Sequence, residues 1–217
     1  MLEALPTDAG DPGAPLRYLA LGDSYTIGEG VDPSQCWPGQ LAQALRADGV
    51  AIDAPRTIAQ TGWTTDELEA ALDAAALQPE YDLVSLLIGV NNQYRERPLE
   101  EYRQQFSALL LHALALAQGR HAHVLVLSIP DWGVTPFARD DARGAQRIGE
   151  AVDAFNTVAR EVCQQHCVVF VDITPVSRAY GAEPTMLVAD GLHPSAPMYA
   201  RWMQLALPHV HAMQVTS

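Results

Sequence analysis

Short apolar runs alternate with segments of helical periodicity along almost the whole sequence. The predicted strands cover residues 17–22, 51–59, 81–90, 124–129 and 167–173, and the helical segments cover 40–47, 64–77, 102–114, 148–162 and 195–207. Strands that are apolar on both faces and are separated by helices are typical of one parallel sheet covered by helices on each side. The sequence therefore predicts an α/β fold, with a five-stranded parallel sheet inside three layers.

The chain is long enough for one domain and shows no internal repeat or linker. It has 217 residues, of which 48% are hydrophobic, enough for a sizeable core. Residues 1–16 are rich in Pro and Gly and are predicted to form a flexible arm, whereas 17–217 form the domain. The first residues lack a basic start followed by an apolar stretch, so a cytoplasmic protein is expected, although a removed leader leaves an exported origin open.

The net charge and the hydropathy of the chain indicate which kinds of molecule it can bind. The formal net charge is −13, and such an acidic surface repels nucleic-acid phosphates and anionic membranes. No apolar run approaches the roughly 20 residues that cross a bilayer. A small, neutral substrate is therefore expected, while the oligomeric state stays open.

The loop after the first predicted strand decides between two classes of protein. The stretch 19–30 reads LALGDSYTIGEG, so its glycines either cradle a phosphate or present Ser24 as a nucleophile. It has no lysine for a Walker A loop and not the glycine spacing of a dinucleotide fold. It is not the G-x-S-x-G turn of an α/β-hydrolase either, because Thr26 stands at the second glycine position. These absences favour a nucleophilic Ser24.

A second group of reactive side chains is expected at the same edge of the sheet. In parallel sheets, ligands bind beyond the carboxyl ends of the strands. The segment after the fifth predicted strand contains DGLH, which places Asp190 three residues before His193. A serine hydrolase needs an imidazole to take the hydroxyl proton and a carboxylate to orient that imidazole. His121 and His123 have the spacing of metal ligands but no third ligand nearby, so no metal is expected.

Two further residues fit the same chemistry. Gly62 follows the second predicted strand and permits close backbone approach, and Asn91 follows the third and carries an uncharged amide donor. Taken singly, each also suits an ordinary turn. Together with Ser24, Asp190 and His193, they favour a site that stabilises an oxyanion. Asp23, beside the nucleophile, is predicted to hydrogen-bond loop backbone.

Four blocks of the chain resemble the GDSL, or SGNH, hydrolases: GDSY at 22–25, the glycine at Gly62, GVNN at 89–92 and DGLH at 190–193. Their order and separation fit over nearly the whole domain. Two departures are visible, since Asn92 stands where the family usually has an acid and Gln60 where many members have Asn. Neither position carries a reacting group.

The resemblance implies a flavodoxin-like SGNH hydrolase fold and a serine esterase or lipase-like activity without a metal or other cofactor. By position, Ser24 would be the nucleophile, His193 the base and Asp190 its partner, with an oxyanion hole formed by Ser24, Gly62 and Asn91. A non-catalytic flavodoxin-like ligand-binding module remains the alternative. The acyl group and the alcohol of the substrate are left open.

Two further predictions concern a long loop and the cysteines, which lie outside these blocks. The connection 131–144 is long for a loop at this edge and contains Trp132 and Phe137, so it is predicted to shape the substrate pocket. The three cysteines are predicted to be buried thiols, with a Cys163–Cys167 disulfide as the other possibility.

Overall fold

The computed structural model describes residues 14–214 and contains a parallel sheet of five strands in the order β2-β1-β3-β4-β5. The strands are β1 (Tyr18–Gly22), β2 (Arg56–Ala59), β3 (Leu83–Leu87), β4 (Val124–Leu127) and β5 (Val169–Val171). Every neighbouring pair is parallel, and β1 lies between β2 and β3. The predicted fold class is therefore confirmed, and the strand order is that of flavodoxin-like folds.

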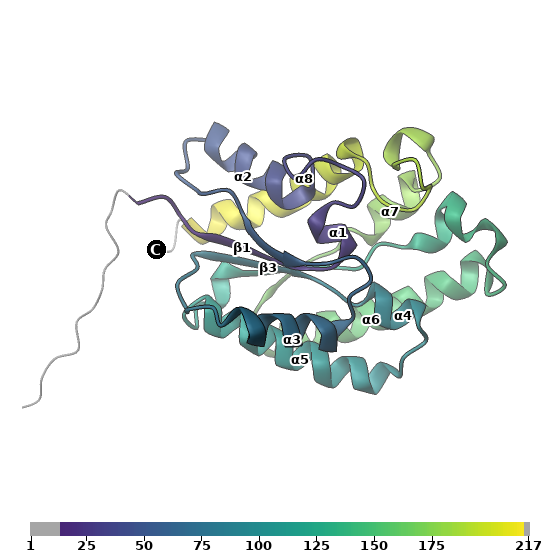
Figure 1. The fold of residues 1–217 in the computed structure, drawn as a ribbon, viewed down its shortest axis with the longest axis horizontal. Coiled ribbons are helices and arrows are strands. Elements are labelled where there is room, and N and C mark those ends of the chain that lie inside the picture. The colour runs from purple at the N-terminus through teal and green to yellow at the C-terminus, as the bar shows by residue number, and fades with distance from the viewer. Residues whose placement is uncertain (1–13, 215–217) are drawn as a thin grey trace, which may run out of the picture.

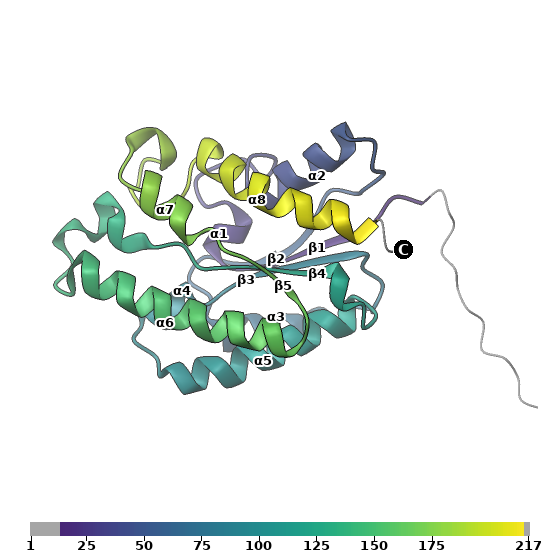
Figure 2. The ribbon, with the colours of Figure 1, turned by 180° about the vertical axis from the view of Figure 1, so that it is seen from behind.

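Helices cover both faces of the sheet (Figure 1). One layer holds α1 (Ser24–Ile27), α2 (Trp37–Ala47), α7 (Thr174–Tyr180) and α8 (Ala196–Gln214), and the other holds α3 (Thr65–Ala75), α4 (Val90–Tyr94), α5 (Leu99–Leu116) and α6 (Gly144–Gln165). The reverse view shows the same two layers with the sheet between them (Figure 2). Short 3-10 helices lie at His121–His123, Trp132–Val134, Pro136–Asp140 and Pro184–Met186.

The core explains why the central strands read as continuous apolar runs. Every residue of β1, β3 and β4 is buried, whereas the edge strand β2 is exposed or half-buried. A central parallel strand is covered on both faces by helices, so it has no polar side. None of the helices in the described part of the chain has the length and apolar character needed to cross a membrane.

Some predicted boundaries are wrong. The apolar run 81–90 was predicted to be one strand, but β3 ends at Leu87 and Val90 begins α4. Gly89 breaks the strand with a φ of +128°, a conformation that side chains other than glycine rarely adopt. The second strand is also shorter than predicted, since only Arg56–Ala59 pairs with β1.

The predicted arm and the cysteines can be compared with the structure in part. Residues 1–13 of the arm lie outside the described residues, and Leu16 forms a parallel bridge with Ile52 and packs against the core. Cys36 and Cys163 are buried free thiols, as predicted. Cys167 is also free but exposed, so the disulfide is not formed and the prediction of three buried thiols is wrong for Cys167.

Candidate active site

The strand order brings three of the predicted site residues to one edge of the sheet. Strand β1 leads into Ser24 and its neighbour β3 leads toward Asn91, while β2, on the other side of β1, leads toward Gly62. Ligands in this topology bind at the crevice where the strand order reverses, beyond the carboxyl ends of the strands. The three residues therefore lie at the expected position for a site.

Ser24 is presented by a tight transition from strand to helix. It is the first residue of α1, and it is 5% exposed. Gly22 makes the turn possible, because a Cβ there would collide with Thr26 Oγ1 and with the carbonyl oxygen of Leu87. The Asp23 carboxylate caps α1 by accepting the Tyr25 N–H at 3.0 Å, the backbone contact predicted for it.

Asp23 is also an unusual buried acid. Its side chain is fully buried, and its Oδ2 atom has no hydrogen-bond partner among the described residues. Burial raises the pKa of this carboxyl from 3.8 to about 7, against the opposing effect of the Tyr25 N–H. The folded protein therefore holds a proton on Asp23 over a pH range in which the unfolded chain has lost it.

The proton on Asp23 should make the free energy of unfolding depend on pH. Because the pKa in the folded state is the higher one, the contribution of Asp23 to stability is largest below pH 4 and is lost as the pH rises through about 7. We expect this loss to be about 2 to 3 kcal/mol between pH 5 and pH 8, at roughly 1.4 kcal/mol per pH unit up to about pH 7 and little beyond it. Asp23→Asn keeps the cap and should lack this loss. Urea unfolding of both proteins at the two pH values measures the difference, and parallel pH dependences would contradict it.

His193 and Asp190 form a close pair. The Nδ1 atom of His193 lies 2.6 Å from Asp190 Oδ2, and Asp190 Oδ1 accepts the N–H groups of Leu192 and His193 at 2.8 and 3.0 Å. Partial burial opposes ionisation of Asp190, but these hydrogen bonds outweigh it, so the pKa of the carboxyl is below its ordinary value. The carboxylate thus fixes Nδ1 as the protonated nitrogen and leaves Nε2 free to accept a proton.

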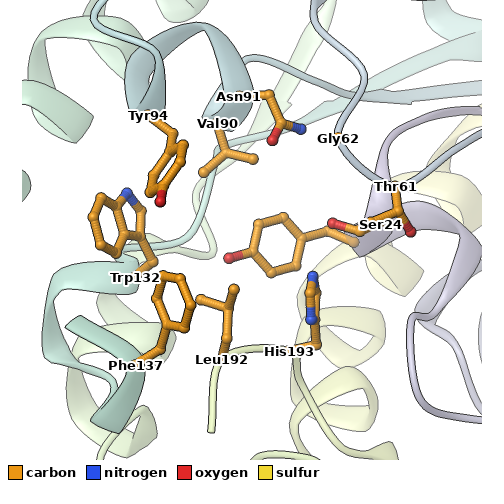
Figure 3. A pocket seen from close by; sticks show the side chains of 11 residues that line it. Ser24, Thr61, Gly62, Val90, Asn91, Tyr94, Trp132, Phe137, Leu192 and His193 are labelled. Atoms are coloured by element: carbon orange, nitrogen blue, oxygen red, sulfur yellow. The ribbon is translucent and has the colours of Figure 1, made fainter. Parts of the chain in front are cut away.

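One pocket brings Ser24 and His193 together. It has a volume of about 200 Å³ and is lined by Ser24, Tyr25, Thr61, Gly62, Val90, Asn91, Tyr94, Trp132, Phe137, Leu192 and His193. Figure 3 shows Ser24 and His193 facing each other on one side, with Asn91 and Gly62 beside them. Asp190 stands behind His193, outside this lining. Ser24, Gly62, Asn91 and His193 thus line one pocket, and Asp190 reaches it through the imidazole.

The Gly62 turn and Asn91 are connected directly. Gly62 has a φ of +87°, and the Nδ2 atom of Asn91 donates to the carbonyl oxygen of the next residue, Trp63, at 2.9 Å. An amide nitrogen carries two hydrogens, so one remains for the pocket. Asn92 points elsewhere. It is fully buried, accepts the Thr65 N–H and donates to Thr65 Oγ1, so it joins α4 to α3.

The wall opposite Ser24 is aromatic. Trp132 packs edge-on against Tyr94 at 5.4 Å and against Phe137 at 6.1 Å between ring centroids. The guanidinium of Arg143 lies over the rings of Tyr94 and Trp132, at 5.0 and 4.9 Å from their centroids. Two 3-10 helices thus give the segment 131–144 its shape, and Trp132 and Phe137 from this segment line the pocket. That substrate binds against them stays a prediction.

Some lining residues were missed by the sequence analysis. Tyr25 and Val90 lie within the blocks GDSY and GVNN, and Thr61 directly precedes Gly62, so their position after a strand was the available signal. Tyr25 is buried, and its ring lies 5.6 Å from that of His193, where it supports the imidazole. Tyr94 was missed because no helix was predicted directly after Val90, where α4 carries it to the pocket.

A cluster with metal-ligand character lies away from this pocket. Glu69 and Asp73 of α3 and His112 of α5 each offer one ligand atom, all within 4.8 Å of one another. Glu69 and His112 already pair at 3.1 Å. None of the three lines the pocket, in which His193 is the one histidine among the described residues.

The fold and the four sequence blocks point to a hydrolase, and the comparison with known families agrees. The model of the GDSL-like Lipase/Acylhydrolase family matches residues 20–201. The chain therefore belongs to this family, as the four sequence blocks indicated. No curated protein sequence matches the chain.

Solved structures share the fold at low sequence identity. The lipase/acylhydrolase from Enterococcus faecalis is 22% identical, with a TM-score of 0.71 over 91% of this chain and 96% of that chain. An acetylxylan esterase from Geobacillus stearothermophilus is 19% identical, with a TM-score of 0.67 over 91% and 95%. A psychrotrophic esterase from Pseudoalteromonas sp. is 16% identical, with a TM-score of 0.65 over 90% and 97%. At these identities the likeness concerns the fold.

Proposed function

We propose that the protein is a serine esterase that hydrolyses carboxylic esters of small molecules through an acyl-enzyme. The observation that carries the proposal is the shared pocket of Ser24 and His193, with Asp190 2.6 Å from the far nitrogen of the imidazole. A ligand-binding module would have no need of an oriented imidazole facing a serine. The lipase and esterases among the structural neighbours support the same class of reaction.

The chemistry follows from the positions of the proton donors and acceptors. Nε2 of His193 takes the proton of Ser24 Oγ as this oxygen attacks the ester carbonyl, and the Asp190 carboxylate stabilises the imidazolium. Within residues 14–214, Ser24 Oγ has no hydrogen-bond partner. Hydrogen bonds between a nucleophile and its base often form fully only when substrate is bound. His193 then protonates the leaving alcohol, and the same histidine activates the water that cleaves the acyl-enzyme.

Three donors would hold the charge that develops on the carbonyl oxygen. The N–H of Ser24 lies in the first turn of α1, where no intrahelical acceptor exists. The Gly62 N–H has no acceptor among the described residues, and Asn91 keeps one amide hydrogen free. Donors fixed before the reaction need no reorganisation when the charge appears, which makes such a site effective.

We expect the esterase rate to be lower at acid pH than at neutral pH. The reason is that the proposed base accepts a proton only as a neutral imidazole. Asp190 should stay ionised through this range, because its hydrogen bonds keep its pKa below the ordinary value for a carboxyl. A kcat/KM profile from pH 5 to 9 measures this. A profile that is flat through neutrality, or activity that EDTA abolishes and zinc restores, would contradict the mechanism.

The aromatic wall favours an acyl group larger than acetyl. The pocket has a volume of about 200 Å³, and most of its lining side chains are apolar. A longer acyl chain would bury more apolar surface there than acetyl does. We expect p-nitrophenyl butyrate and hexanoate to be better substrates than the acetate. A panel of these esters, run beside an acetylated sugar and a thioester, tests the proposal, and no hydrolysis of any of them would overturn it.

Phe137 should set part of this preference. It lines the pocket yet is 47% exposed, as expected for a side chain at the mouth that contacts the longer substrates. Phe137→Ala should lower kcat/KM for the hexanoate about fivefold relative to the acetate, since about 1 kcal/mol of apolar contact would be lost. Leu111→Ala is the matched control, because Leu111 is 52% exposed on α5. An unchanged ratio in Phe137→Ala would remove Phe137 from the acyl site.

A further inference from the structure

Arg95 lies one helical turn after Asn91, and both contact the Gly62 turn. The Nη2 atom of Arg95 donates to the carbonyl oxygen of Gly62 at 2.7 Å, next to the Trp63 carbonyl that Asn91 holds. Residues four apart share one face of a helix. Two successive carbonyls of the turn are therefore bound by side chains from one face of α4 and its C-cap.

The turn has few other attachments. Gln60 and Thr61 are exposed, and the turn is closed by one hydrogen bond, from the Trp63 N–H to the carbonyl of Gln60 at 3.2 Å. On the far side, Thr61 Oγ1 donates to Glu29. Gly62 itself has no side chain to pack, and its φ of +87° is one that glycine adopts much more easily than other residues. The orientation of the Gly62 N–H thus depends on the groups that hold the turn from outside.

We propose that Arg95 is a positioning residue of the oxyanion hole, which holds the Gly62 carbonyl and so restricts the turn that aims the Gly62 N–H at the reacting carbonyl. This inference rests on the esterase function proposed above. Its physical basis is that a donor stabilises an oxyanion only if it is aimed before the charge appears. The ion pair of Arg95 with Glu67, at 3.5 Å and largely exposed, contributes little by comparison.

Arg97 provides a matched control on the same segment. Its guanidinium pairs with Asp66 at 2.6 Å and with Glu101 at 3.4 Å, and it is assigned no bond to the Gly62 turn. Arg97→Ala therefore removes the same charge close to the pocket without removing a contact to the turn. Arg95→Lys supplies the opposite comparison, since it keeps the charge and a donor but loses the planar fork.

The test is the kcat and KM of these variants with p-nitrophenyl butyrate, together with their melting temperatures. Arg95→Ala should lower kcat about tenfold, a part of the 10² to 10³ lost when an oxyanion donor is removed outright. Its KM should stay within about twofold, because the ground-state carbonyl is not yet in the hole. Arg95→Lys should fall between Arg95→Ala and wild type, and Arg97→Ala should match wild type.

Glycine-selective ¹⁵N NMR adds a readout that does not depend on activity. The Gly62 amide signal should shift in Arg95→Ala and stay in place in Arg97→Ala. If wild type is active but the two alanine variants have equal kcat, the positioning role is overturned and the esterase function stands. If wild type shows no hydrolysis that depends on Ser24, the esterase function is overturned and the inference falls with it.

Discussion

Ser24→Ala is expected to abolish ester hydrolysis, with a loss in kcat on the order of 10⁶-fold, as when a triad serine is removed elsewhere. Only the attacking oxygen is lost, whereas Asp23 still caps α1 and the turn from β1 is unchanged. The melting temperature should therefore stay close to that of wild type. Initial rates with p-nitrophenyl butyrate and a thermal melt are the two measurements.

The residual rate decides what the result means. Ser24→Ala keeps the oxyanion donors and the pocket, so a small rate above the uncatalysed reaction is compatible with the mechanism. Ser177→Ala is a control for the loss of a buried serine, because Ser177 accepts the Asp131 N–H and is not part of the pocket lining. It should lower stability but leave kcat nearly unchanged. A rate above about a hundredth of wild type in Ser24→Ala would place the nucleophile elsewhere.

Asn91→Ala should lower kcat by about 10² to 10³, or roughly 3 to 4 kcal/mol of transition-state stabilisation, and raise KM much less. It removes one amide donor at the pocket and also the anchor of the Trp63 carbonyl. Asn91→Asp should be worse, because a carboxylate repels the oxyanion and cannot donate to the Trp63 carbonyl. Steady-state kinetics of the two variants test this order.

Asn92 separates the loss of a donor from a disturbance of α4. The sequence alone suggests that Asn92→Ala would leave activity unchanged. In the structure, however, the Asn92 side chain is buried and makes two hydrogen bonds to Thr65. Its replacement should therefore lower the melting temperature while kcat falls less than in Asn91→Ala. If Asn92→Ala has the lower kcat and Asn91→Ala is mild, the oxyanion donor has been assigned to the wrong residue.

The sequence predicted the features that depend on the strand ends. The carboxyl ends of parallel strands meet at one edge, so the segments with Ser24, Gly62, Asn91 and His193 could be expected to converge without knowledge of side-chain positions. The pairing of Asp190 with His193 is local, across three residues of one loop, and was accessible for the same reason.

What the sequence could not predict depends on contacts between distant residues. Hydrophobicity alone continued the third strand to Val90, because it does not register that Gly89 turns the backbone into α4. The contacts of Arg95 with Gly62 and of Arg143 with Trp132 join segments whose relation only the packed helices fix. These contacts orient the groups around the pocket, and nothing in the local pattern distinguishes them from surface arginines.

Labelling with a fluorophosphonate is the most direct test of a nucleophilic Ser24. The reagent phosphonylates an activated serine hydroxyl, and peptide mass spectrometry locates the adduct. The proposed mechanism predicts one adduct, on Ser24, that forms much more slowly in His193→Ala and not at all in Ser24→Ala. An enzyme that hydrolyses esters but remains unlabelled, or that carries the adduct on another residue, would contradict the mechanism.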